Sequence, residues 1–580
     1  MDFSIPMKRI VPLAVATVIV VVATVWFMFG RDRPTQYMVA AANPYASGAG
    51  AAILAKGGSA VDAAIAVQAV LTLVEPESSG LAGGAFMLHW ASASEKLDAY
   101  DGRETAPAGA TQDMFLDDGK APLGIVPAIL SGRSVGSPGA VAMLAMAHKE
   151  HGKLPWADLF QPAIELSENG FVVSQKLAAA VARDPALAMM PASQDYFFTK
   201  DTSGKRIPVA AGSVLKNPLL AETLKVIAAE GIDGFYKGAV AQSIVDAVHA
   251  APSRPGTLSM SDLAKYEAKH REPLCRPYRV YVVCTMPPPT SGGIATLQVL
   301  GILSHFYMDQ IEPMSLTAVH FIAEAEKLAY ADRGKFLGDP DFVHVPVEAL
   351  LDKDYLAGRA ALIDPSASIG KAEPGKLNDK AADNQGTNVS VAFPSTSHFS
   401  IVDADGDVVS MTTSVEAPFG SHLMAGGMIL NNQLTDFSFV PTEDGRPVAN
   451  AVAPNKRPMS AMDPVIVFNK TGDFYAALGS PGGSRIIGYV TQSLVAVLDW
   501  KMSMQEAFDQ PRFLDRNGPL EIEEGTSLEK LTRDLTQLGH EVKPTKINSG
   551  LHGIRVTPEG LDGGADPRRE GKVISGFVER

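Results

Sequence analysis

Thr396 is the residue in this sequence whose surroundings most suggest chemistry. It begins the alternating segment 396–400 (TSHFS) and follows a mostly polar run from Asn384 to Ser395. A threonine hydroxyl is a poor nucleophile unless a base lies beside it. One available base is the residue's own α-amine, which is released when the chain is cut just before it. The segment therefore predicts an amidase that cleaves itself between Ser395 and Thr396.

A predicted hairpin brings a second hydroxyl opposite Thr396. Two apolar segments, 399–402 and 408–411, flank the loop 404–406, and a three-residue loop with glycine in the left-handed last position is a favoured connection. In that register Thr396 faces Ser414, with the β-carbons about 5 Å apart. Alternation groups them on one face with other polar residues, namely His398, Ser400, Thr412 and Glu416. The alternative is an ordinary polar hairpin that faces solvent.

A glycine-rich turn offers donors for the charge that develops on a reacting carbonyl. Gly482 and Gly483 lie in the segment 479–485 (GSPGGSR), after the predicted strand Phe474–Leu478 and before a helical run. Consecutive glycines let backbone N–H groups point into a site, as an oxyanion hole requires. A plain tight turn is one alternative. A phosphate-binding loop is another, but no lysine follows in the P-loop position.

The bulk composition is that of a globular protein and excludes some classes of function. Of the 580 residues, 46% are hydrophobic and 20% are charged, which is enough apolar material for one large α/β unit or for several domains. The formal net charge is −14 and there is no long basic run, which argues against nucleic acid as a partner. No Cys/His spacing of the zinc-finger type occurs.

The N-terminal region predicts a membrane anchor. Residues 10–30 carry no charge and are rich in Val, Ile and Ala, with basic residues on both flanks. That length spans a bilayer. A cleaved signal peptide is the alternative, but its apolar region is normally shorter and ends at a small-residue cleavage site. Because Lys8 and Arg9 are unopposed, we expect residues 1–9 in the cytoplasm and the body outside, in the periplasm if the protein is bacterial.

Cys275 and Cys284, the two cysteines of the chain, lie in two predicted short strands around a turn near Pro277. Cross-strand pairing would bring the thiols close enough to bond in an oxidising compartment. Two buried free thiols are the alternative, and the sequence does not decide between them.

Helical and extended patterns alternate along the rest of the chain. Residues 46–74 predict two helices separated by Gly57-Gly58, and further helices are expected over Pro218–Glu230 and Ala239–Ala250. The region 365–395 is polar and reads as a surface loop, after which strands dominate.

At this point the sequence resembles the γ-glutamyltransferase (γ-glutamyl transpeptidase) family of N-terminal nucleophile hydrolases. An ordered series of segments from Met38 to Phe577 carries the resemblance. The series is 38–44 (MVAAANP), 57–63 (GGSAVDA), 79–84 (SGLAGG), 101–107 (DGRETAP), the proline cluster at 287, 331–333 (ADR), the Thr396 strand, 431–437 (NNQLTDF), 455–460 (NKRPMS), 479–485 and 566–568 (DPR).

The resemblance implies an α/β fold, a four-layer αββα sandwich of the N-terminal nucleophile hydrolase type. It implies a cut between Ser395 and Thr396 that yields a large subunit, 35–395, and a small subunit, 396–580, which stay associated. Thr396 is then the nucleophile, and its new α-amine, with a reference pKa of about 7.7 to 8.0, is the base. Ser414 matches a supporting hydroxyl, and Gly482 and Gly483 match the oxyanion pair.

The family also implies how a γ-glutamyl donor is held. The donor carries an α-carboxylate and an α-ammonium, and such charges must be matched in a pocket. Arg103 and Ser460 match the carboxylate clamp. Glu416, Gln433 and Asp436 match the ammonium ligands.

Three departures from the family pattern concern specificity. Glu416 replaces the Asn of many members, which suits an ammonium and opposes an acyl group without one. Ala461 replaces a second Ser, which removes a donor to the carboxylate. Only 13 residues, with no Tyr, separate Asp436 from Asn450, so the aromatic lid of some members is missing and we expect an open site.

The sequence thus predicts a membrane-anchored, extracytoplasmic γ-glutamyltransferase and hydrolase that needs no metal or organic cofactor. Its expected partners are glutathione or a similar donor, an amine, peptide or water as acceptor, and no nucleic acid. A glutaryl or cephalosporin acylase of the same family is the nearest alternative. An unprocessed, membrane-anchored binding module is the alternative from another class.

Overall fold

The computed structural model describes residues 35–118, 120–379, 385–388 and 395–578. Its two largest sheets contain the strands of the predicted hairpin and of the glycine-rich turn. The first has seven strands, in the order β24 (Lys572–Val578), β1 (Thr35–Ala41), β11 (Ser397–Val402), β12 (Val408–Ser414), β2 (Gly84–Ala91), β3 (Lys96–Gly102) and β8 (Lys269–Arg271). The second has six, in the order β23 (Gly560–Ala565), β22 (His552–Thr557), β18 (Phe474–Gly479), β17 (Val465–Phe468), β10 (Tyr281–Thr285) and β9 (Leu274–Tyr278).

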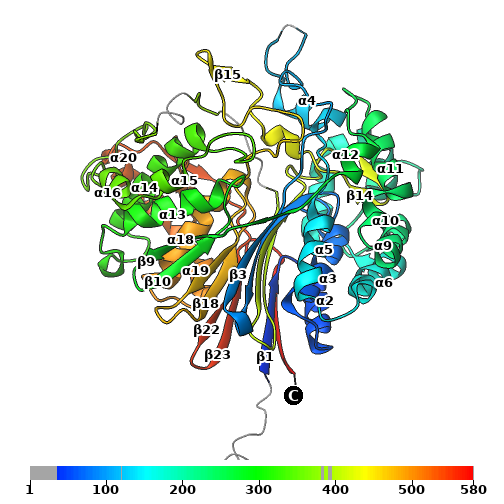
Figure 1. Ribbon diagram of the computed structural model, residues 1–580, viewed down its shortest axis with the longest axis horizontal. Helices are drawn as coiled ribbons and strands as arrows, with labels where there is room; N and C mark the ends of the chain where they lie inside the picture. Colours follow the sequence, from blue (N-terminus) through cyan, green and yellow to red (C-terminus); the bar gives the residue numbers. More distant parts are fainter. Residues whose placement is uncertain (1–34, 119, 380–384, 389–394, 579–580) are drawn as a thin grey trace, which may run out of the picture.

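The two sheets face each other, and helices cover their outer sides (Figure 1). On the side of the seven-stranded sheet lie α2 (Pro44–Ala55), α3 (Ala60–Val74), α5 (Ala140–His151), α6 (Gln161–Asn169), α9 (Pro218–Glu230) and α11 (Gly238–His249). On the side of the six-stranded sheet lie α13 (Gly292–Leu303), α14 (Leu316–Phe336) and α18 (Ile486–Leu498). The mixed α/β content and the helices expected around Gly57-Gly58, at 218–230 and at 239–250 are confirmed.

Alternation along β1 explains why the core has two halves. Met38 and Ala40 belong to the cluster between the sheets and around α13, α14 and α18, whereas Val39 and Ala41 belong to the cluster beneath α2 and α3. Successive side chains of a strand point to opposite faces. A strand that is buried on both faces is therefore apolar throughout.

The two cysteines form a disulfide across β9 and β10, where Cys275 pairs with Cys284 in the register. The turn, however, was expected near Pro277, and this was wrong by about two residues. Pro277 lies within β9 opposite Val282, and the strands turn after Tyr278. Since β9 is the edge strand of its sheet, the missing N–H of Pro277 costs no ladder hydrogen bond.

The structure describes no helix that is both long and apolar enough to cross a bilayer. The expected anchor at 10–30 and the N-terminal residues 1–9 lie outside the described residues, so both remain predictions.

Candidate active site

The hairpin has the register that the sequence predicted. Ser397 pairs with Thr413 and His398 with Thr412, which brings Thr396 opposite Ser414. The hydroxyl of Thr396 donates to Ser414 Oγ over 3.2 Å. The solvent-facing alternative is wrong, because every residue of β11 and β12 is buried. The hairpin lies in the middle of the seven-stranded sheet, between β1 and β2, and its polar face turns toward the other sheet.

His398 satisfies its polar atoms within that buried face. Its Nδ1 lies 2.9 Å from Thr412 Oγ1 and its Nε2 lies 3.2 Å from Ser400 Oγ. Burial lowers the pKa of His398 well below its usual value, so the ring is neutral. A β-carbon on Gly479 of β18 would lie 2.4 Å from the ring. His398 therefore packs between the sheets, and it does not line the pocket that contains Thr396.

The peptide bond before Thr396 is held on both sides. Ser395 donates its hydroxyl to the carbonyl of Glu77, and Arg569 Nη1 donates to the carbonyl of Thr396 over 3.0 Å. Thr396 itself has φ +145°, a conformation that is costly for a β-branched residue. Such strain persists only where the surroundings enforce it, and it is typical of functional sites.

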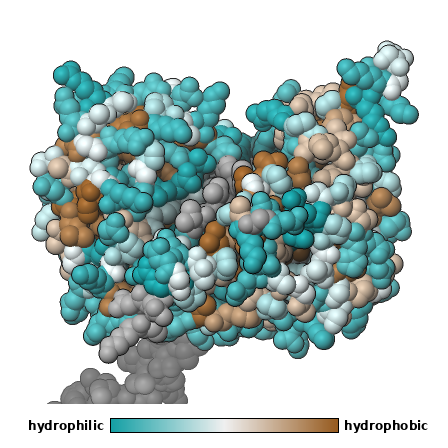
Figure 2. All heavy atoms as spheres, turned by 90° about the horizontal axis from the view of Figure 1, so that it is seen from above, coloured by the Kyte–Doolittle hydropathy of each residue, from teal (hydrophilic) through white to brown (hydrophobic). Residues whose placement is uncertain are grey.

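One pocket contains most of the predicted site residues together with Thr396. Figure 2 shows that the face of the molecule seen from above is hollowed between two raised sides. Its lining includes Arg103, Thr396, Ser414, Glu416, Gln433, Asp436, Ser460 and Gly483. Gly482 and Ser395 are the predicted site residues that do not line it. Both glycines have positive φ, +143° for Gly482 and +58° for Gly483, and a β-carbon on Gly482 would meet Tyr489 at 2.8 Å. The turn therefore requires glycine at this point.

Arg103 and Asp436 form a buried ion pair at the floor of this pocket. Arg103 Nη2 lies 2.5 Å from Asp436 Oδ2, and the guanidinium also donates to the carbonyls of Pro458 and Met459, each over 3.1 Å. Arg103 follows directly after β3, and Asp436 ends the 3₁₀ turn η6 (Gln433–Asp436). Residues 333 positions apart in the sequence thus meet as two opposite charges in one pocket.

Glu416, two residues after the end of β12, adds a second carboxylate. Its N–H donates to Ser414 Oγ over 2.9 Å, which orients the hydroxyl opposite Thr396. Its Oε2 accepts from Asn432 Nδ2 over 2.5 Å. Ser460 Oγ accepts the N–H of Met462 over 3.1 Å, so its proton can still be donated to a ligand.

Three further residues support the site and were not singled out from the sequence. Asn432 holds Glu416, and Arg569 holds the Thr396 carbonyl. Glu104 is fully buried 3.6 Å from Arg103 Nη1, and burial raises its pKa to about 8. Each of them lies in or next to one of the sequence segments that carry the family resemblance. This position was the only sign in the sequence that they could belong to the site.

The segment between Asp436 and Asn450 forms a small hairpin, β15 (Thr442–Glu443) and β16 (Arg446–Pro447), at the rim of the molecule (Figure 1). It lines a mainly apolar neighbouring pocket with Pro122, Leu123 and Ile125. The openness of the site stays a prediction.

Among the described residues, three groups of His, Asp and Glu have the spacing to hold a metal ion, and none of their members lines the Thr396 pocket. The pocket instead brings together the hydroxyls of Thr396 and Ser414, one guanidinium and at least two carboxylates. That set complements a small amide that carries both an ammonium and a carboxylate.

Comparison with known proteins agrees with this geometry. A family model described as Gamma-glutamyltranspeptidase matches residues 46–576. The glutathione hydrolase proenzyme of Escherichia coli (strain K12) is 39% identical over 570 residues, which cover 95% of this chain and 93% of that protein. The acylase ACY 1 proenzyme of Pseudomonas sp. (strain SE83) is 36% identical over 561 residues, 94% of each chain. The solved structure of a cephalosporin acylase from Bacillus halodurans superposes with a TM-score of 0.79 at 29% identity, over 93% of this chain and 96% of that one. This chain belongs to the gamma-glutamyltranspeptidase family.

Proposed function

We propose that this protein is a γ-glutamyltransferase and hydrolase that matures by cutting itself before Thr396. The observation that carries the proposal is that Thr396, 3.2 Å from Ser414, shares one pocket with the Arg103–Asp436 ion pair. The donor is glutathione or a related γ-glutamyl amide, and the acceptor is water or an amine.

Maturation begins when the Thr396 hydroxyl attacks the carbonyl carbon of Ser395. The peptide C–N bond breaks as an ester forms on Oγ1, and water then hydrolyses this ester. The products are a carboxylate on Ser395 and a free α-amine on Thr396. The strained φ of Thr396 and the hydrogen bonds of Ser395 and Arg569 on either side favour this bond as the point of cleavage. The large subunit is then 35–395 and the small subunit 396–580.

In the mature enzyme the α-amine of Thr396 takes the hydroxyl proton while Oγ1 attacks the γ-carbonyl of the donor. Backbone N–H groups of Gly482 and Gly483 stabilise the oxyanion, and each is worth roughly 3 kcal/mol of barrier. The proton passes to the leaving amine, and water or an amine then releases the glutamyl group from the acyl-enzyme. Ser414 supports the nucleophile through its hydrogen bond.

Without a donor, Arg103 and Asp436 neutralise each other. A bound donor offers each of them a partner of opposite charge. Its α-carboxylate binds Arg103 and the Ser460 hydroxyl, and its α-ammonium binds Asp436, Glu416 and Gln433. Glu416 favours a donor with an ammonium over a glutaryl group, which lacks one.

We also infer that the two facing sheets with their outer helices are the four-layer αββα sandwich of the N-terminal nucleophile hydrolases. The anchor at 10–30, with residues 1–9 in the cytoplasm and the catalytic body outside, remains part of the proposal. The Cys275–Cys284 disulfide supports an oxidising, extracytoplasmic location.

A glutaryl or cephalosporin acylase is the second candidate, and the similarity to the Bacillus halodurans acylase structure favours it. Hydrolysis of a γ-glutamyl anilide and of a glutaryl anilide by the purified protein separates the two. We expect turnover of the γ-glutamyl compound, and faster release from the glutaryl compound would reverse the assignment.

Thr396→Ala tests whether Thr396 is the nucleophile. Comparison with the unaltered protein also tests the alternative that the protein is never cleaved and serves as a binding module. We expect the unaltered protein to run as two bands under denaturing conditions, with the lighter band beginning at Thr396. The variant should run as one band without activity, whereas Thr471→Ala, in an exposed turn, should behave as the unaltered protein does. A lighter band that begins elsewhere, or two bands from Thr396→Ala, would refute the mechanism.

A further inference from the structure

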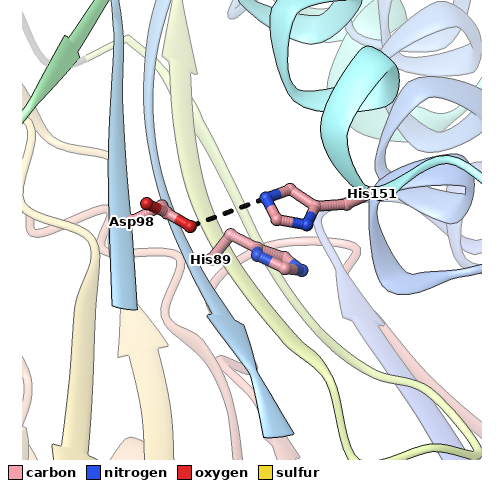
Figure 3. A group of neighbouring side chains, drawn as sticks. All are labelled: His89, Asp98 and His151. Carbon is pink, nitrogen blue, oxygen red and sulfur yellow. Dashed lines mark ion pairs between the residues drawn. The ribbon is translucent and has the colours of Figure 1, made fainter. Parts of the chain in front are cut away.

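A second cluster of chemically active side chains lies on the helix-facing side of the seven-stranded sheet, away from Thr396. His89 of β2 pairs with Asp98 of β3 in the register, and His151 ends α5 above them (Figure 3). Asp98 lies five residues before Arg103, so at ~3.3 Å per residue the cluster is about 16 Å along the strand from the proposed donor site. Neither the catalytic cycle nor the maturation step uses these residues.

The polar atoms of this cluster converge on one another. His151 Nε2 lies 3.6 Å from Asp98 Oδ2, and the rings of His89 and His151 stack with centroids 3.9 Å apart. One ligand atom from each of the three residues falls within 4.8 Å of the other two. A tetrahedral Zn²⁺ site, with bonds of about 2.0–2.2 Å, needs ligand atoms about 3.5 Å apart, so the stacked rings of His89 and His151 must turn for both to reach one ion.

Two of the three residues hold buried atoms that call for a partner. Within the described part of the chain, both ring nitrogens of His89 and Oδ2 of Asp98 are buried without a hydrogen-bond partner. Neither side chain is exposed at all. Buried polar atoms are nearly always satisfied, and an ion is one standard partner for those that no protein group satisfies.

The neighbouring residues orient Asp98, and the cluster is open to solvent only at His151. His270 Nε2 lies 2.7 Å and Lys96 Nζ 2.8 Å from Oδ1, which leaves Oδ2 directed at His151. Tyr100 donates to Glu150 Oε2 over 3.0 Å, and its oxygen also lies 2.8 Å from His151 Nε2, so a zinc ion bound at Nε2 must displace the Tyr100 hydroxyl. The His151 side chain is 17% exposed, which gives an ion a route from solvent.

We propose that His89, Asp98 and His151 bind one Zn²⁺ ion, with water as the fourth ligand. Two imidazoles and a carboxylate form a donor set that zinc accepts. The ion would tie the end of α5 to β2 and β3, and it would therefore stabilise the folded protein without entering the reaction. The proposal does not depend on the proposed enzymatic function.

Equilibrium dialysis of the tag-free full-length protein against ZnCl₂, after removal of metal with a chelator, tests the site. We expect one equivalent of zinc, a zinc-dependent rise in Tm, and affinity at least about tenfold weaker in His151→Gln. His305→Gln, an exposed histidine after α13, is the matched control and should bind as the unaltered protein does.

Co²⁺ in place of Zn²⁺ gives a second readout, because tetrahedral cobalt with nitrogen ligands has intense visible bands. These bands should appear in the unaltered protein and be lost in His151→Gln. Absence of bound zinc in the unaltered protein overturns the proposal whatever the variants do. Equal binding by His151→Gln also overturns it, because the ion would then lie elsewhere, for example at His320, Glu324 and His540.

Discussion

At the scale of single residues, the Arg103–Asp436 pair sets what the pocket can bind. A buried ion pair is costly to desolvate, and removal of one partner leaves the other charge uncompensated. Within the pocket, a donor that brings one charge of each sign replaces one set of matched charges by another. A ligand that carries only a carboxylate provides no positive charge to pair with Asp436 and Glu416. We therefore expect the pocket to favour zwitterionic donors, because other ligands would leave one of its charges unmatched.

Arg103→Ala should raise KM for a γ-glutamyl anilide by roughly 10- to 100-fold, because a charge-assisted hydrogen bond is worth about 1.5–3 kcal/mol. Arg103→Lys should recover only part of this loss, because an ammonium cannot replace the planar fork. Steady-state kinetics measures both. The control is Arg276→Ala, which removes a partly exposed arginine of β9 outside the pocket. Unchanged KM in Arg103→Ala would remove Arg103 from the donor site.

Glu104 gives the site a pH-dependent contribution to stability. Burial raises its pKa from 4.5 to about 8, so the folded state holds a proton that the unfolded state has lost. The free energy of unfolding contributed by this group is therefore fully present below pH 4.5 and falls as the pH rises toward 8.

Glu104→Gln should flatten this fall. Tm measured from pH 5 to pH 8 should decline less in the variant than in the unaltered protein, by at least the equivalent of about 1 kcal/mol. Glu222→Gln, at an exposed position on α9, should leave the profile unchanged. Parallel profiles for Glu104→Gln and the unaltered protein would mean that Glu104 is ionised in the fold.

At the scale of elements, the close approach of β11 and β18 positions the nucleophile strand. Gly479 leaves room for the ring of His398, which in turn holds Thr412 and Ser400. These contacts hold β11, the strand that directly follows Thr396, against the second sheet.

Gly479→Ala should lower stability by roughly 1–3 kcal/mol, because the added methyl group must displace a packed ring. The displaced His398 should also slow the appearance of the two bands. Thermal unfolding and a time course of cleavage measure these effects. Gly358→Ala, in the helix α16 (Lys353–Ala360) with no atom within 4 Å of the new carbon, should be neutral or slightly stabilising. An equal response of the two variants would argue against this role of Gly479.

The β11–β12 hairpin shows which features could be predicted from the sequence and which could not. The contact of Thr396 with Ser414 followed from the turn chemistry of Gly406, because a hairpin loop fixes its own register. The burial of that face did not follow, because polar alternation is the same whether a strand faces water or a second polar surface.

Local sequence patterns did not predict any contact between segments that are far apart in the chain. Arg103 and Asp436 became candidates only through the family resemblance, and Arg569, 173 residues from Thr396, was missed. A pairing of that kind depends on how the sheets stack, which no periodicity in the sequence encodes.

At the scale of the whole molecule, the proposed cut falls inside a continuous sheet. In the seven-stranded sheet, β11 pairs with β1 and β12 pairs with β2, while β24 pairs with the other edge of β1. Strands of the proposed small subunit therefore lie on both sides of β1 of the large one. The two subunits cannot separate without breaking the sheet and the core beneath it.

The cut protein should therefore elute from gel filtration as the uncut Thr396→Ala variant does, even though it gives two bands under denaturing conditions. Denaturant should separate the subunits only at the concentration that unfolds the whole protein. Gel filtration across a urea series, with circular dichroism on the same samples, measures both transitions. Release of the lighter chain well below the unfolding midpoint would contradict the shared sheet.

The backbone angle of Thr396 has a consequence for the direction of maturation. A residue at the start of a chain has no preceding carbonyl, so the torsion that is strained at +145° ceases to exist after the cut. Strain of this kind is worth on the order of 1–3 kcal/mol. Religation of Ser395 to Thr396 would have to restore this strain, so in the proposed maturation it shifts the equilibrium toward the two-chain state by roughly 5- to 150-fold relative to an unstrained cleavage.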